Sequence, residues 1–575
     1  MRVLPHHIVC LIHYVELTQA GWWEEVIDRC TLAVLWVLKE PAPMQKIRKE
    51  ISKNLYVEIK ARELRKALTR LERKEEIIKL HDGRYKLAMT KLQELDEYVE
   101  SADTLEETVR ENFCRRVRKA CPKLDPINVW QSFIERFLIP LVTSEGARTY
   151  EFFIGKRVDI RFESYVDLFL EQISPSYRET LTQATYDFLV EADDDVARFL
   201  LSYLDAYFLL SASGLPFRVI KRLMAIRKEP VEFVVFVDTN FVYSILGLHD
   251  NPSNEAANDL MELVDSTSDN LHFQFVIKPS TLEETQRSLR HHKKQLGNAK
   301  YPPNVARAAA STQIYGVYKT FFERVSMAGQ SISAADYFVP YEDNLIRILE
   351  EKGVTVFSGK SPSKYEQTLD IIEDIEAQKE YEDKRFKEHA KTEQQITHDI
   401  VLWHFVQDQR DRKLTLPLQA KWWIVTVDYR FLSFDRHKTR RGELLPACMH
   451  PSQLIQMLRF FVPRSDQFEK TLLAVMRLPI ISREFDPAAE RVSIRIVKHL
   501  ARHEGIEDLQ DDTLANVFAD TALRTYLADA NINEEEEIEA IQNTLTQQLL
   551  KQELLIEERG TEISALKKRV EKLDV

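Results

Sequence analysis

The sequence predicts a multidomain protein that is mainly helical and contains one α/β domain. The chain has 575 residues, and because a single hydrophobic core stops growing near ~250–300 residues, this length requires at least two domains. Hydrophobic residues make up 44% and charged residues 30%, a balance typical of globular domains and too apolar for a disordered chain. Between residues 231 and 461, short β-branched runs alternate with helical patterns, which indicates a parallel sheet covered by helices.

These patterns divide the chain into four parts. They are a helix-rich module with a hairpin (residues 1–95), a helical domain (96–228), the α/β domain (229–461) and a helical region ending in an expected coiled coil (462–575). Within the α/β domain we expect a helical insertion over residues 285–395.

The N-terminal module has the pattern of three helices followed by a hairpin. An apolar helix at 30–38 stops before Pro41, and two further helices are expected at 44–52 and 61–73. The dipeptide Asp82-Gly83 is typical of a tight turn between two short alternating strands. This order of elements resembles a winged helix-turn-helix module.

Residues 41–90 are locally basic, with 14 Lys or Arg against 7 Asp or Glu. Such an excess suits contact with the phosphates of DNA or RNA. The alternatives are a solvated helix face and a module that docks a protein partner. The residues alone leave these interpretations open.

The last helix carries a heptad pattern. Leu549, Ile556, Ile563 and Val570 recur every seven residues, and a second seam holds Leu545, Leu566 and Leu573, with interruptions at Gln552 and Arg559. One expectation is that these C-terminal helices form a coiled-coil homodimer or bind another protein partner. The alternative is that the last helix packs within its own chain.

Two acids follow predicted strands of the α/β region. The strand at 231–237 is a nearly continuous β-branched and aromatic run that ends in Asp238. The strand at 422–427 ends in Asp428. A further strand is expected at 354–357.

Two more acids belong to predicted helices. A strand at 272–277 leads into a helix whose first turn holds Glu284, and Asp399 lies in the first turn of a helix that opens at Ile396. In an open parallel sheet, the carboxyl ends of strands and the helix starts that follow them face one edge, where α/β folds bind their ligands. We therefore expect all four acids to meet there.

A carboxylate cluster at such an edge needs a cation. The acids would repel one another and raise their own pKa values unless a positive charge held them together. Hard divalent ions prefer oxygen ligands, so Mg²⁺ or Mn²⁺ is the expected occupant, and no His/Cys cluster predicts a zinc site. Taken singly, an Asp after a strand is most often a turn or cap residue, but four acids in register with the sheet order argue for a site.

The segments around these acids resemble a known family. VFVDTNFVYSIL, VIKPSTLEET, THDIVLWHFV and IVTVDYRF occur in this order and are followed by LLPACMHPSQLIQML. They are similar to the acidic motifs of the PIN-domain nucleases, which have a flap-endonuclease-like fold and act as metal-dependent ribonucleases, less often on DNA. The resemblance covers the α/β domain only.

The resemblance implies roles for single residues. The catalytic, metal-binding acids would be Asp238, Glu284, Asp399 and Asp428, with Glu283 as the alternative second acid. The polar positions that support the cluster match Thr239, Asn240 and Thr426. The sequence departs from compact family members in the 114 positions that separate Glu284 from Asp399.

Two basic stretches begin within a few residues of these acids. Residues 285–322 contain seven Lys or Arg and no Asp or Glu, interleaved with Tyr301, Tyr315, Tyr318, Phe321 and Phe322, and residues 430–441 have a net charge of +4. Cations can neutralise phosphates, and aromatic faces can stack on unpaired bases. We expect substrate contacts from Arg287, Arg290, Lys293, Lys294, Arg430 and Arg436. The alternative is a basic helix packed by its aromatic residues.

These patterns predict a metal-dependent nuclease, with RNA favoured over DNA as substrate. The net charge of −12 at first argues against a nucleic-acid partner, but the acidic excess lies outside the basic stretches. One alternative is a catalytically inactive PIN-like nucleic-acid-binding or scaffold protein. Another is a winged-helix transcriptional regulator.

The remaining features concern compartment. The five cysteines match neither a disulfide framework nor a zinc knuckle. No run of ~18 uncharged apolar residues predicts a membrane span. We expect a cytoplasmic protein with no membrane partner.

Overall fold

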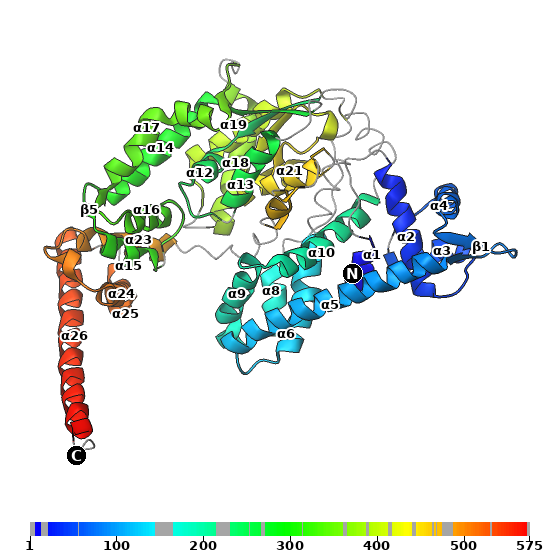
Figure 1. Ribbon diagram of the computed structural model, residues 1–575. Helices are drawn as coiled ribbons and strands as arrows, with labels where there is room; N and C mark the ends of the chain where they lie inside the picture. The colour runs from blue at the N-terminus through cyan, green and yellow to red at the C-terminus, as the bar shows by residue number, and fades with distance from the viewer. Residues whose placement is uncertain are drawn as a thin grey trace.

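The computed structural model has a mainly helical fold with one five-stranded parallel sheet, as the sequence predicts (Figure 1). The structure describes residues 6–12, 21–55, 57–143, 165–213, 231–251, 253–265, 271–312, 314–359, 365–386, 390–411, 414, 417–439, 444–459, 461–462, 465–466, 468–473, 487–528 and 532–571. Within these residues, no helix is long and apolar enough to cross a membrane.

The N-terminal module has the predicted order of elements. Its helices are α1 (His6–Ile12), α2 (Trp22–Leu38), α3 (Met44–Glu50), which continues as the π-helical turn η1 (Ile51–Leu55), and α4 (Ala61–Arg73), followed by strands β1 (Ile77–Lys79) and β2 (Tyr85–Leu87). The two strands pair antiparallel, which confirms the predicted hairpin. Helix α4 packs on α2 through Leu64, Leu68 and Leu71, all buried, and the guanidinium of Arg70 pairs with the Asp28 carboxylate at 2.7 Å.

A helical region follows the hairpin. It comprises α5 (Met89–Ala120), α6 (Pro126–Ser132), η2 (Phe133–Leu138), α8 (Tyr165–Leu170), α9 (Pro175–Val190) and α10 (Asp194–Ser213). Its core is aromatic: the ring of Phe113 lies within 5.4 Å (centroid to centroid) of Trp130, Phe133 and Phe188.

The parallel sheet has the strand order β7-β4-β3-β8-β9. The strands are β3 (Val231–Val237), β4 (Leu271–Ile277), β7 (Val354–Val356), β8 (Trp422–Val425) and β9 (Cys448–Met449). Alternate residues of β3 belong to two separate apolar clusters, Val235 to one and Phe236 to the other. Both faces of the sheet are therefore buried, which explains why this strand is a continuous apolar run.

The helices that accompany the sheet determine where its edge residues lie. They are α12 (Thr239–Leu246), α13 (Asn254–Asp265), α14 (Pro279–Leu296), α19 (Glu393–Asp408), α20 (Tyr429–Thr439) and α21 (Pro451–Leu458). Trp403 of α19 and Phe434 of α20 belong to the cluster on one face, and Leu260 of α13 and Leu289 of α14 belong to the cluster on the other.

The insertion is helical, as predicted, and its aromatic residues form a core. It contains β5 (Lys300–Tyr301), α15 (Pro303–Ala310), α16 (Gly316–Ala328), β6 (Ile332–Ser333), α17 (Ala334–Glu351) and α18 (Leu369–Phe386). Tyr301, Tyr318, Phe321 and Phe322 are all buried. These four rings pack the helices instead of presenting faces to bases, so the packing alternative describes them correctly.

The C-terminal helices dock on the insertion. They are α23 (Pro487–Leu500), α24 (Asp511–Ala519), α25 (Thr521–Leu527) and α26 (Glu534–Glu571). The side-chain amide of Asn304 in α15 donates to the backbone oxygens of Ile506 at 2.7 Å and Leu509 at 3.1 Å. Arg307 forms an ion pair with Asp511. Figure 1 shows that the C-terminal part of α26 extends away from the body of the molecule.

The first half of the heptad seam on α26 packs within the chain. Leu545 is buried and Leu549 packs against the same core, and the Thr513 hydroxyl donates to the side-chain oxygen of Gln552 at 2.6 Å. This half therefore matches the intramolecular alternative. The described structure does not include the side chains of Ile556, Leu566 and Val570, nor any part of Leu573.

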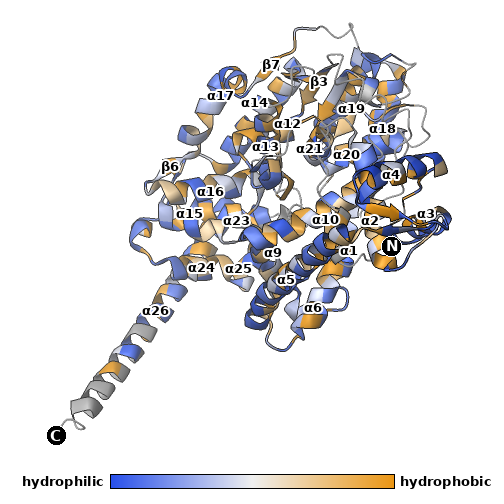
Figure 2. Ribbon diagram, turned by 45° about the vertical axis from the view of Figure 1, so that its right-hand side comes forward, coloured by the Kyte–Doolittle hydropathy of each residue, from blue (hydrophilic) through white to orange (hydrophobic). Residues whose placement is uncertain are grey.

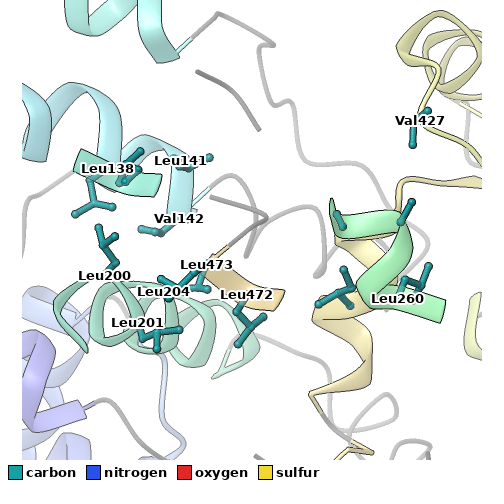
Figure 3. Packing of buried hydrophobic residues seen from close by; sticks show 14 of the residues in the cluster. Leu138, Leu141, Val142, Leu200, Leu201, Leu204, Leu260, Val427, Leu472 and Leu473 are labelled. Carbon is teal, nitrogen blue, oxygen red and sulfur yellow. The ribbon is translucent and has the colours of Figure 1, made fainter. Parts of the chain in front are cut away.

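Contacts distant in sequence join the α/β region to the helical region. Leu473, which follows the α/β region, lies next to Leu204 of α10 in Figure 3, and Leu472 and Leu201 belong to the same apolar cluster. Arg459, at the end of α21, pairs with Asp205 of α10, and both side chains are buried.

Candidate functional site

The four predicted acids meet at the carboxyl edge of the sheet. Asp238 follows β3, Asp428 follows β8, Glu284 lies in α14 after β4, and Asp399 lies in α19. Hydrogen bonds and ion pairs link the four carboxyl groups through shared neighbours, so that four elements distant in sequence contribute to one cluster.

Asp238 is the most buried of the four acids, with 2% of its surface exposed. Its Oδ1 accepts from the Phe241 backbone N–H at 2.7 Å, and its Oδ2 accepts from the Thr426 hydroxyl at 2.5 Å. The pKa of Asp238 is raised from 3.8 to about 7, mainly by burial; the two hydrogen bonds lower it, and the carboxylates of Asp428 and Asp399 add to the rise. Its charged form is therefore poorly compensated within the protein.

Asp428 is held by the start of the next helix. Its Oδ1 accepts from the backbone N–H groups of Arg430 at 2.8 Å and Phe431 at 3.3 Å, in the first turn of α20. Its Oδ2 accepts from the Asn240 side-chain amide at 3.3 Å and from the Lys391 ammonium at 2.5 Å. Asp428 is thus a helix-capping residue and a member of the cluster at once.

Glu284, and not Glu283, is the glutamate that joins the cluster. Its Oε2 accepts from the Thr239 hydroxyl at 2.6 Å and lies 3.0 Å from Nδ1 of His398. Burial raises the pKa of Glu284; His398 lowers it and Asp399 raises it. Glu283 is exposed on the outer face of α14.

Both helices begin earlier than the sequence suggested. Helix α14 starts at Pro279, and α19 starts after Thr392, whose hydroxyl accepts from the Gln395 backbone N–H in a capping box. Glu284 and Asp399 therefore lie in the second turns of their helices, and the expectation of first-turn positions was wrong. Helix α14 can begin at Pro279 because a proline has no N–H group that needs an acceptor at the first helical position. Helix α19 can begin three residues before Ile396 because the capping box at Thr392 provides acceptors for free N–H groups at its start.

Lys391 is a member of the cluster that sequence reasoning missed. Its ammonium nitrogen lies 2.6 Å from Oδ2 of Asp399 and 2.5 Å from Oδ2 of Asp428, with 14% of its side chain exposed. Burial lowers the pKa of Lys391, but the two carboxylates outweigh this and raise it overall. Burial likewise raises the pKa of Asp399, and Lys391 and His398 more than reverse that rise. Nothing in the sequence marks a lysine eight positions before the acid as its partner.

His398 is the second missed residue. Its Nε2 lies 2.8 Å from the Thr281 hydroxyl, and its Nδ1 lies 3.0 Å from Glu284 and 3.4 Å from Asp399. Burial lowers the pKa of His398, but Asp399, Glu284 and Asp238 outweigh this effect and raise the pKa overall. Its position directly before an expected acid was a signal that could have found it.

A buried glutamate connects Lys391 to the second basic stretch. Glu382 of α18 has no exposed side-chain surface. Its Oε2 accepts from the Lys391 backbone N–H at 3.3 Å and from the Arg430 guanidinium at 2.9 Å, and Arg430 also lies over the ring of Phe386 at 4.0 Å. Arg430 is thus fixed beside the acidic edge. Arg436, further along α20, is half-buried.

The cations expected on α14 lie along the helix that carries Glu284. Lys293 pairs with Glu342 of α17 at 2.7 Å. Arg287, Arg290 and Lys294 are exposed. Arg287 follows Glu284 by three residues, about one helical turn, and is the nearest of them along the chain to the acidic edge.

The donor chemistry of the cluster suits a hard divalent cation, but the arrangement is not a ready-made coordination shell. Four carboxylates from separate elements are the ligand type of Mg²⁺ and Mn²⁺. Among the described residues, however, no three His, Cys, Asp or Glu side chains are arranged so that they could hold a metal ion together. The Lys391 ammonium lies between two of the acids and supplies positive charge in this arrangement.

No protein-family model, curated protein or solved structure matches this chain. The functional argument therefore rests on the geometry and chemistry of the cluster.

Proposed function

We propose that this chain is a metal-dependent nuclease that hydrolyses phosphodiester bonds, with RNA favoured over DNA as substrate. The observation that supports this proposal is the convergence of four carboxylates at the carboxyl edge of a parallel sheet, next to Arg430 and the exposed cations of α14. Acids that share so small a space favour a hard cation. Basic side chains beside them suit the phosphates of a nucleic acid.

The proposed roles follow from the contacts. Mg²⁺ or Mn²⁺ would be held by Asp238, Glu284, Asp399 and Asp428, and when bound it would lower the pKa of a coordinated water and offset charge on the phosphate. Three side chains hold carboxylates of the cluster through hydrogen bonds and thereby orient them: Thr239, Asn240 and Thr426. Arg430, held by Glu382, would bind a flanking phosphate.

Asp238→Asn tests the proposal directly. The amide preserves the shape of the side chain and removes its negative charge, so Mn²⁺-dependent cleavage should fall by about 100-fold or more, since even outer-shell partners of metals contribute 10–100-fold. The measurement is cleavage of labelled single- and double-stranded RNA and DNA with Mn²⁺, Mg²⁺ or EDTA.

The matched control is Asp383→Asn, which removes an exposed carboxylate of α18 and should leave cleavage unchanged. Circular dichroism should show the same fold in all three proteins. Equal activity of wild type and Asp238→Asn, or cleavage that persists in EDTA, would refute the assignment.

A second candidate function is nucleic-acid binding by the N-terminal module. Helix α4 buries one face against α2, and its opposite face exposes Arg62, Arg65, Lys66 and Arg73; Figure 2 shows α4 largely in the hydrophilic colour. Among the residues that the structure describes, none of these four cations takes part in an ion pair. In a helix-turn-helix arrangement, a helix placed in this way contacts the nucleic acid.

The test of this second function is Arg62→Gln/Arg65→Gln in the full-length chain. Each cation removed from a phosphate should reduce the slope of log affinity against log salt by about 1, so binding of labelled duplex should weaken and the slope should fall by about 2. The control is Arg115→Gln/Lys119→Gln, which changes two exposed cations of α5. Equal effects of the two double variants would exclude α4 as the nucleic-acid-binding helix.

A further inference from the structure

The position of Lys391 bears on how the acidic cluster takes up its cation. The ammonium lies 2.6 Å from Asp399 and 2.5 Å from Asp428, two acids that come from different elements. A divalent ion held by these two acids would need the carboxylate oxygens that the ammonium contacts. The two cations would repel each other at those oxygens, so they cannot both lie there.

The chain holds Lys391 in this position from both sides. The Glu382 carboxylate accepts from the Lys391 backbone N–H at 3.3 Å, and the other oxygen of Glu382 accepts from the Gln378 amide at 3.3 Å. Directly after Lys391, Thr392 caps α19. The Lys391 backbone is therefore tied to α18 through the Glu382 side chain and lies next to the start of α19.

Lys391 and His398 contact carboxylate oxygens that a metal ion would need. Its ammonium engages one oxygen of Asp399 and one of Asp428, and His398 contacts the other oxygen of Asp399 and Glu284. Among the described residues no metal-holding group of three is present, although the donors are of the correct chemical type. The Lys391 ammonium and a divalent ion would need the same carboxylate oxygens.

We propose that the Lys391 ammonium is an internal competitor of the divalent cation, which must leave Asp399 and Asp428 before a metal ion can bridge them. This inference rests on the proposed function, because it assigns the cluster to a metal. Metal uptake then includes the release of a lysine, and the cluster binds metal more weakly than four carboxylates alone would.

The test is Mn²⁺ binding by wild type and Lys391→Met, followed by electron paramagnetic resonance of the free ion. Methionine has a similar length and no charge, so the variant should bind Mn²⁺ about tenfold more tightly, and its thermal midpoint should rise more on Mn²⁺ addition than that of wild type. The control is Lys379→Met, which removes an exposed lysine paired with Glu393 and should bind Mn²⁺ as wild type does. Equal or weaker binding by Lys391→Met would overturn the proposal.

A measurement on the wild-type protein covers the case in which Lys391→Met does not fold. Lysine acetylation by acetic anhydride, quantified at each residue by mass spectrometry, should be low at Lys391 without metal and should rise as Mn²⁺ displaces the ammonium. Labelling of Lys379 should not change. Labelling of Lys391 that does not respond to Mn²⁺ would overturn the proposal.

Asp238→Asn separates the failure of this inference from the failure of the proposed function. If cleavage depends on Asp238 but Lys391→Met does not bind Mn²⁺ more tightly, the proposed nuclease function stands and the proposed competition by Lys391 is rejected. If Lys391→Met binds Mn²⁺ more tightly but no substrate is cleaved, the competition by Lys391 stands and the nuclease function is rejected. No Mn²⁺ binding by either protein would reject both.

Discussion

Asp238 and Asp428 each have a local and a collective role. Asp238 accepts a hydrogen bond from the first turn of α12, and Asp428 does so from the first turn of α20. Both are therefore the cap residues that a lone Asp after a strand usually is. The same carboxyl groups lie beside Asp399 and Glu284, so the structural and functional interpretations of these residues are compatible.

Glu490 is a buried carboxyl group far along the chain from the acidic cluster. It is 8% exposed, and its Oε1 accepts from the Tyr315 backbone N–H at 2.9 Å. Burial raises the pKa of Glu490 from 4.5 to about 7, although the Tyr315 N–H and Arg491 lower it. The folded protein thus holds this proton more tightly than the unfolded chain does, and its contribution to stability is lost as pH rises from 4.5 to about 7.

Glu490→Gln should remove this pH dependence. The glutamine side chain is neutral at every pH. The free energy of unfolding of the variant, relative to that of wild type, should therefore rise between pH 5 and pH 8, by an amount approaching ~3 kcal/mol, because each pKa unit corresponds to about 1.4 kcal/mol. The measurement is urea unfolding of both proteins at the two pH values. Glu179→Gln, an exposed position on α9, is the control, and a constant difference between Glu490→Gln and wild type would contradict the prediction.

The strands were the elements that local sequence predicted best. The run at 231–237 became β3 with the same bounds, and the strand expected at 272–277 became β4 with one more residue. Continuous β-branched and aromatic runs have few alternatives to a buried parallel strand. Helix α4 also has the predicted bounds, 61–73, because its leucines recur at helical spacing.

Helix starts and helix partners were predicted less well. The starts of α14 and α19 depend on a proline and a capping box that precede the apolar pattern. The heptad pattern of α26 does not indicate which helix or chain its apolar residues pack against. In the structure, Leu545 and Leu549 pack within the chain. The same limit applies to the aromatics of the insertion, which suit base stacking or core packing equally until their neighbours are known.

At the scale of the whole molecule, a buried ion pair ties the α/β region to the helical region. Arg459 pairs with Asp205, and its guanidinium lies 4.2 Å from the ring centroid of Phe208. Both charged side chains are buried. Removing one partner of a buried ion pair is strongly destabilising, because water does not replace the lost charge there.

Arg459→Met should therefore destabilise the protein by about 3–5 kcal/mol, because it removes the positive charge that pairs with the buried Asp205 carboxylate. Arg459→Met/Asp205→Leu should recover much of this loss, because an apolar pair does not require charge compensation. The measurement is urea unfolding of the two variants and of Asp205→Leu, which completes the double-mutant cycle. Additive effects would show that the two side chains do not interact.

The sequence by itself determined the alternation of strands and helices, the parallel sheet and the four acids at its carboxyl edge. These follow from short-range patterns: apolar periodicity, and acids placed directly after strands or early in helices. Only the tertiary structure decided that Glu284 and not Glu283 enters the cluster and that Lys391 and His398 contact its carboxyl groups. Those contacts depend on how α14, α18 and α19 pack together, and the partners of a charged side chain are set by that packing and not by its neighbours in sequence.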